Sequence, residues 1–272
     1  MTGAAVRVPP RMRPPSRFVL LILLIAAAFL VHAFSEGAAI SPSSIVDGVG
    51  RTGEFVAEAF PPSSERLGAV AAAMLETFEI ALVGTLAGVV LSLPLAVLAA
   101  RNTSPGLPVY GAARALIAFL RSVPDLVWGL VFVVTVGLGP EAGVLAIAID
   151  TMGFCGRFFA DRIEDVEPRV IEALTATGAS RSGVVAAAVI PSATPAFVGI
   201  SMFALEHATR SSVVLGVVGA GGIGVELTTS MELLRYDEAL TIILAIFVVV
   251  LAVERLAAAI RRRVGADAGA LV

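Results

Sequence analysis

The sequence predicts an all-α membrane protein with about six transmembrane helices. Hydrophobic residues make up 57% of the 272-residue chain and charged residues only 15%, whereas soluble domains carry about 25% charged residues. The mean hydropathy is +0.93. Apolar runs of about 20 residues, the length that a helix needs to cross a bilayer, recur along the chain. They are continuous, unlike the alternating segments of about ten residues in a transmembrane β-barrel.

The first 66 residues are expected to hold an N-terminal anchor helix and an external connector. The apolar run at 18–34 follows several arginines and is short for a span, so a cleaved signal peptide is the competing interpretation. We expect a retained anchor, because many further spans follow. The polar connector at 35–66 includes a short amphipathic piece near 45–60.

Residues 67–258 are expected to form the membrane-embedded core. Its predicted spans are 80–100, 110–138, 144–159, 191–214 and 239–253. Arg121, Pro124 and Asp125 interrupt the second of these spans. Turn-forming glycines and prolines separate the spans on either side of it. The remaining segment, 259–272, is expected to be a cytoplasmic tail.

The distribution of arginines predicts how the spans are oriented. All 19 basic residues are arginine. With six spans, both termini and the polar segment 157–191 share the arginine-rich side, and only Arg51, Arg66 and Arg235 fall on the other. Because positive residues collect on the cytoplasmic side, both termini and this segment are predicted to be cytoplasmic.

The composition argues against several kinds of active site. The chain has no lysine, and an ordinary P-loop needs its lysine to contact the β- and γ-phosphates of ATP. The single cysteine excludes an intrachain disulfide, and a total of two histidines argues against a metal site. Polar residues within the spans form isolated pairs, whereas a membrane-embedded enzyme needs a cluster. We therefore expect no catalytic residue, no metal and no cofactor in this chain.

The polar segment 157–191 has the local pattern of two short helices. Residues 162–177 predict one helix, with Val166, Val170 and Leu174 on one stripe. Gly178 suits the left-handed residue that often ends a helix. Ser180 suits the N-cap of a second helix, and Pro191 the first turn of the next one. The pattern alone also fits an ordinary amphipathic hairpin on the membrane surface.

This segment resembles the EAA motif of ABC importer permeases of the type I fold. Glu172, Ala173, Gly178 and Pro191 stand at the spacing of the motif, whereas Leu174 departs from it by occupying a second alanine position. The resemblance implies a type I importer permease fold with an extra N-terminal helix. It also implies that 162–190 is a coupling-helix pair that docks on a cytoplasmic ATPase.

Further stretches resemble one branch, the phosphonate ABC transporter permeases. They include FPPSSERL at 60–67, RSVPDLVWGLVFV at 121–133, GPEAGVLAIAI at 139–149 and VLGVVGAGGIG at 214–224. The resemblance covers nearly all of 60–258. It implies that the carried solute is a phosphonate-type oxyanion, with phosphite, hypophosphite, phosphate or another small solute as alternatives.

The resemblance also implies partners and a location. A second copy of the chain is expected, because five spans make half of a pathway and a two-fold homodimer completes it. Two ABC ATPase subunits, which bind ATP and Mg, and an external or periplasmic solute-binding protein complete the complex. The location is the bacterial cytoplasmic membrane, with lipid around the spans and no nucleic acid. An ion-gradient secondary transporter is the alternative class, but it predicts internal repeats, which the sequence does not show.

Two pairs of charges lie within predicted spans. Arg121 and Asp125, and likewise Glu206 and Arg210, are four residues apart and so are predicted to share a helix face; His207 adjoins the second pair. A charge at the bilayer centre costs about 2.5–3.5 kcal/mol and therefore faces protein or water. The charges could line a translocation path that attracts an oxyanion, or they could pair and fix the helix packing.

Gly219, Gly221 and Gly224 match the pattern G-x-G-x-x-G, with Gly222 between them. In a dinucleotide-binding unit this pattern follows a strand and opens a helix, whereas here it follows a membrane span. We predict a flexible or tightly turned external loop near the point where substrate enters.

Overall fold

The computed structural model describes residues 16–32 and 42–269, and its regular structure in these ranges is entirely helical. The chain divides into two units, Met1–Glu58 and Ala59–Val272. The first unit contains α1, Arg17–His32, and most of α2, Pro42–Ala59. The helix α1 is apolar but only 16 residues long. The helix α2 covers most of the amphipathic piece expected near 45–60 of the connector.

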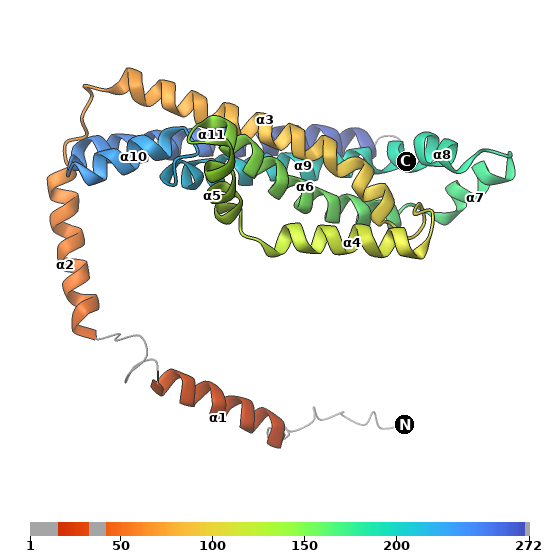
Figure 1. Ribbon diagram of the computed structural model, residues 1–272, viewed down its shortest axis with the longest axis horizontal. Helices are drawn as coiled ribbons and strands as arrows, with labels where there is room; N and C mark the ends of the chain where they lie inside the picture. Colours follow the sequence, from red (N-terminus) through yellow and green to blue (C-terminus); the bar gives the residue numbers. More distant parts are fainter. Residues whose placement is uncertain (1–15, 33–41, 270–272) are drawn as a thin grey trace, which may run out of the picture. The chain divides into compact units, whose positions relative to one another are not determined.

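Long apolar helices build the second unit. They are α3, Leu67–Ala99, α6, Pro140–Glu164, α9, Ile190–Val217, and α11, Tyr236–Gly269. Figure 1 shows them running alongside one another. Among the described residues, four helices are long and apolar enough to cross a membrane, and a bent pair adds a fifth if it crosses as one span. The all-α membrane fold is therefore confirmed.

The predicted span 110–138 is two helices. The helix α4, Leu107–Ser122, and the helix α5, Asp125–Val136, are bent by 88° relative to each other. Val123 adopts an extended conformation between them (φ −94°, ψ 121°), because the ring of Pro124 disfavours helix at the residue before it. The prediction that Arg121 and Asp125 share one helix face is therefore wrong.

Two other spans are longer than predicted. The helix α3 includes the half-polar residues 67–79 together with the apolar run, and it contains Pro94 in its interior, as membrane helices tolerate. The helix α11 continues through residues 259–269 of the expected tail. No proline lies between 67 and 79 or between 254 and 264 to end either helix.

Glycines allow α3 and α6 to pack closely. A Cβ atom at Gly84 would lie 2.8 Å from the Cβ of Ile147, and one at Gly88 would lie 2.5 Å from the Cβ of Thr151. Small residues four apart are a common device for close packing in membranes. The main buried cluster continues from these helices to α9 through Phe159 and Phe197, whose ring centroids are 4.3 Å apart.

Candidate functional site

The polar segment forms a helical hairpin at one end of the bundle (Figure 1). It consists of α7, Pro168–Ala176, and the short α8, Arg181–Val184. The predicted single helix over 162–177 is wrong in its first part, because α6 ends at Glu164 and a new helix begins at Pro168. Glu167 is extended (ψ 124°), as expected for a residue before proline.

The turn of the hairpin confirms two local predictions. Gly178 has φ +82°, the left-handed conformation that glycine adopts without steric cost. Its N–H donates to the Thr175 carbonyl at 3.0 Å, and the N–H of Ala179 donates to the Leu174 carbonyl at 3.4 Å. Ser180 caps the next helix, since its Oγ accepts a hydrogen bond from the Gly183 N–H at 3.2 Å.

The chain runs from α8 into α9 without a break. A π-helical turn, Val185–Val189, joins α8 to α9, and the combined run Arg181–Val217 is 37 residues long. Pro191 lies in the first turn of α9, as predicted, although the helix continues through it rather than starting there. A proline has no N–H for the preceding turn, and a wider π turn is one way in which a helix accommodates the missing bond.

The hairpin is largely exposed. None of the residues of α7 is buried, and the side chains of Glu172 and Ala173 are exposed. Ile171 is partly buried against the main core cluster and anchors α7 to the bundle. The hairpin therefore presents a polar surface, with Glu172 on it, at one end of an apolar bundle.

Within the bundle, Glu206 pairs with a residue that the sequence did not indicate. Its Oε1 lies 2.9 Å from Nη2 of Arg261 on α11. Arg210, which shares the helical spacing of Glu206, is exposed and has no carboxylate within ion-pair distance among the described residues. The pairing of Glu206 with Arg210, one of the two roles that the sequence left open, is therefore not formed, and Glu206 pairs with Arg261 instead. A buried carboxylate needs a counterion, and the packing of α11 against α9 supplies one.

Two polar side chains, Asp150 of α6 and His207 of α9, lie close to the break between α4 and α5. Asp150 of α6 has its Oδ2 4.0 Å from Nε2 of His207 on α9, and the Oγ of Ser211 lies 3.5 Å from the same nitrogen. Asp150 also interacts electrostatically with Arg121 and Asp125. We call Arg121, Asp125, Asp150 and His207 the intramembrane cluster. Three members of this cluster, Arg121, Asp125 and His207, were singled out from the sequence. Asp150 is the member that the structure adds.

Asp150 is visible in the sequence as the single acidic residue inside the apolar run 144–159, but it has no partner at helical spacing to mark it as a site residue. Arg121 has no carboxylate within ion-pair distance among the residues that the structure describes. Its Cζ lies 5.8 Å from the ring centroid of Phe158, a cation–π contact.

The glycine loop is tightly turned. Gly219, Gly221 and Gly222 all have positive φ, between 76° and 89°. The N–H of Gly222 donates to Glu76 Oε1 at 3.1 Å, and the next N–H, of Ile223, donates to Thr77 Oγ1 at 2.7 Å.

Gly224 lies in the first turn of α10, Ile223–Glu232, where a side chain would collide with the Val213 carbonyl. No strand precedes the loop in the described ranges, so the dinucleotide-binding unit is absent there. Gly224, the last glycine of the pattern, therefore serves the close packing of α10 against α9.

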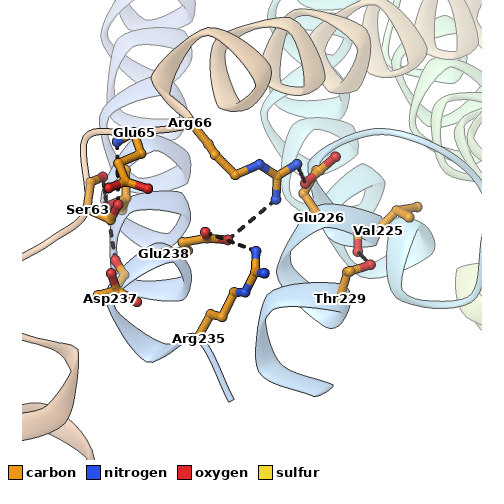
Figure 2. Close-up of polar contacts among 10 residues, drawn as sticks. Ser63, Glu65, Arg66, Val225, Glu226, Thr229, Arg235, Asp237 and Glu238 are labelled. Atoms are coloured by element: carbon orange, nitrogen blue, oxygen red, sulfur yellow. Dashed lines mark hydrogen bonds and ion pairs between the residues drawn. The ribbon is translucent and has the colours of Figure 1, made fainter. Parts of the chain in front are cut away.

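An ion-pair network lies beside this loop (Figure 2). Arg66, directly before α3, contacts Glu226 of α10 at 2.9 Å and Glu238 of α11 at 3.4 Å, and Arg235 contacts Glu238 at 3.3 Å. The network joins the ends of three helices. Local sequence patterns carry no signal for the contacts of Arg66, because Arg66 and Glu226 lie 160 positions apart.

Comparison with known proteins identifies the family. Residues 92–266 match the family of the binding-protein-dependent transport system inner membrane component. The chain is 38% identical over 220 residues to the phosphite transport system permease protein PtxC of Stutzerimonas stutzeri, covering 81% of this chain and 80% of that one. It is 42% identical over 204 residues to the phosphate-import permease protein PhnE of Mycolicibacterium smegmatis, covering 75% of this chain but only 38% of that relative.

The fold agrees with this assignment. The structure of the inward-facing MetNI methionine ABC transporter superposes with a TM-score of 0.65 at 24% identity, covering 74% of this chain and 99% of that one. At this identity the likeness concerns the fold alone. The chain is a multi-pass membrane protein that belongs to the family of binding-protein-dependent transport system inner membrane components.

Proposed function

We propose that this chain is the permease subunit of an ATP-driven importer that moves a phosphonate-type oxyanion into the cell by alternating access. The observation that carries the proposal is the exposed α7–α8 hairpin, with Glu172 on its surface, at one end of an apolar bundle. The relatives named for phosphite and phosphate support a phosphorus oxyanion. Phosphite, hypophosphite and phosphate themselves remain alternative substrates.

The proposed coupling follows from the continuity of α8 with α9. An ATPase that grips the hairpin at Glu172, Ala173 and Gly178 moves α8, and the unbroken run Arg181–Val217 transmits that movement into the bundle. The same run carries His207 and Arg210. A rigid element that contacts a partner at one end and the substrate path at the other supplies the linkage between two sites.

Within the proposed translocation path, we assign a role to each charged residue according to whether it has an ion-pair partner. Arg210 and Arg121 keep guanidinium groups without a carboxylate partner among the described residues, and they attract the oxyanion. Asp125, Asp150 and His207 shape the field around it. Glu206 is satisfied by Arg261 and fixes α9 against α11 instead of contacting substrate.

The assembly that we propose is a homodimer with two ATPase subunits and an external solute-binding protein. ATP and Mg bind to the ATPase subunits, and both termini are cytoplasmic. The glycine loop at Gly219–Gly224 and the Arg66 network then lie on the external side, where their fixed geometry suits docking of the binding protein.

Reconstitution tests the proposal. Proteoliposomes that contain this chain, its ATPase and its binding protein are assayed for ATP hydrolysis and for uptake of methylphosphonate, phosphite and phosphate. We expect ATP-dependent uptake of at least one of these anions and little uptake of an amino acid. Uptake that needs an ion gradient and proceeds without the ATPase would instead establish a secondary transporter.

A further inference from the structure

A cavity of about 440 Å³ lies between the hairpin and the end of the bundle. It is lined by the α3–α4 loop, by Tyr110 of α4 and by Arg181 of α8. Two of its lining residues are arginines, Arg101 and Arg181, and none is acidic. It is therefore a positively charged hollow formed by elements that lie far apart in the sequence.

Arg101 is held in place by Tyr110 and interacts electrostatically with Glu164. Its Nε donates to the Tyr110 hydroxyl at 3.2 Å, and its Cζ lies 5.6 Å from the centroid of the same ring. The hydrogen bond to Tyr110 raises the pKa of Arg101. The nearby Glu164 is occupied by Arg114, at 3.0 Å, and by the backbone N–H of Arg101, at 2.8 Å. The terminal amino groups of Arg101 have no carboxylate within ion-pair distance among the described residues.

Arg181 provides the second positive charge, from the α8 side of the cavity. It is the first residue of α8, it is exposed, and no described carboxylate lies within ion-pair distance of it. It also lines a neighbouring cavity of about 240 Å³ together with Asn102 and Thr103 of the same loop. Arg181 therefore lies between the α3–α4 loop and the hairpin.

We infer that Arg101, Arg181 and Tyr110 bind a phosphate-bearing group. Guanidinium groups match phosphate oxygens with paired hydrogen bonds. Tyr110 accepts its hydrogen bond from Arg101, so its own proton is free to donate to an anion. The cavity is larger than a bare phosphate requires, and the apolar side chain of Leu107, 80% exposed, forms part of its wall.

The phosphate-bearing group could come from two sources. One is the headgroup of an anionic phospholipid, since basic pockets between helices at the cytoplasmic surface bind such headgroups. The other is a free phosphate-type anion in the cytoplasm. In either case the ligand bridges the α3–α4 loop and α8. A ligand that bridges these two elements restrains the coupling hairpin and slows its ATPase-driven movement. This consequence for regulation rests on the proposed function.

The test measures binding to the purified full-length chain, without the ATPase. Inorganic phosphate is titrated calorimetrically, and phosphatidylglycerol and phosphatidylcholine are compared by native mass spectrometry. We expect Arg101→Gln and Arg181→Gln each to weaken binding about tenfold or more, which corresponds to about 1.4 kcal/mol. Arg181→Lys is expected to be intermediate, because it keeps the charge and loses the planar fork.

Arg169→Gln is the matched control, because Arg169 lies on α7 outside the cavity with its side chain 89% exposed. It should bind as the original chain does. Tyr110→Phe provides a second variant that keeps the ring under Arg101 and removes only the hydroxyl. Binding of phosphate alone identifies a free anion as the ligand, and binding of phosphatidylglycerol alone identifies a lipid headgroup.

Equal binding of the probes to the original chain and to the two glutamine variants would overturn the inference. Failure of both phosphate and phosphatidylglycerol to bind the original chain would overturn it as well. If Arg181→Gln then weakened association with the ATPase, the arginines would instead be assigned to an acidic protein surface. Because binding is measured on this chain alone, a negative result leaves the transport proposal standing, and failure of transport leaves the binding result unaffected.

Discussion

Glu206 on α9 and Arg261 on α11 form an ion pair with 2.9 Å between Oε1 and Nη2, although they lie 55 positions apart in the sequence. The side chain of Glu206 is only 7% exposed and that of Arg261 is 33% exposed. Arg261 reaches this carboxylate from the arginine-rich end of α11. The pair therefore fixes the last helix to the helix that continues from the hairpin.

Removing the cation from this pair should destabilise the protein. Arg261→Gln leaves a buried carboxylate without its partner, and breaking a buried pair in this way costs about 3–5 kcal/mol. We expect a clearly lower thermal unfolding midpoint in detergent. Glu206→Gln should be milder, because a neutral amide needs no counterion. Arg262→Gln, at an exposed neighbouring position, serves as the control, and an equal loss in both arginine variants would contradict a specific pair.

Gly178→Ala should weaken the turn of the hairpin. The position has φ +82°, although nothing lies within 4 Å of the place that a Cβ atom would occupy, so the cost is conformational and amounts to about 1–2 kcal/mol. Hydrogen exchange of α7 should accelerate, and the ratio of transport to ATP hydrolysis should fall. Gly111→Ala, in an equally open site within α4, should leave both unchanged. Undisturbed exchange and coupling in the Gly178 variant would show that the turn tolerates other conformations.

Gly88→Ala should disturb the packing of α3 against α6. Its new methyl group would lie 2.5 Å from the Cβ of Thr151 and 2.7 Å from the Ala148 carbonyl oxygen. Overpacking of this kind costs about 1–3 kcal/mol, which lowers the thermal midpoint. Gly199→Ala, on α9 with open space around it, is the control. Equal stability of the two variants would mean that α3 and α6 can move apart at little cost.

Arg210→Gln should lower anion uptake while leaving the complex intact. The guanidinium is exposed on α9 and has no described carboxylate partner, so its loss removes an attraction for the oxyanion rather than a structural contact. Uptake in proteoliposomes and co-purification with the ATPase are measured together. Arg255→Gln, exposed on α11, controls for total charge. Unchanged uptake would remove Arg210 from the path.

Much of the fold could be predicted from the sequence because it depends on local properties. Apolar length identified α3, α6, α9 and α11, and turn chemistry identified the left-handed Gly178 and the Ser180 cap. The break at Pro124 was visible as an interruption, but its 88° angle depends on how α4 and α5 pack against other helices.

The ion pairs between different helices were beyond local reasoning. Helical spacing suggested Arg210 as the partner of Glu206, but spacing gives only the neighbours along one helix. The actual partner comes from another helix, as do the partners of Arg66 and Asp150. Such pairings are decided by which faces of distant helices meet, and hydrophobic periodicity says little about this in helices that are apolar on nearly every side.

The π turn at Val185–Val189 has a geometric consequence for the whole hairpin. Each residue of an α-helix advances the chain by about 100° around the helix axis, so one residue more or fewer in this turn would swing α7 to a different side of the α9 axis. The length of the turn thus sets the direction, around the α9 axis, in which Glu172 points. A change in this length would redirect Glu172 even if every residue of the hairpin stayed the same.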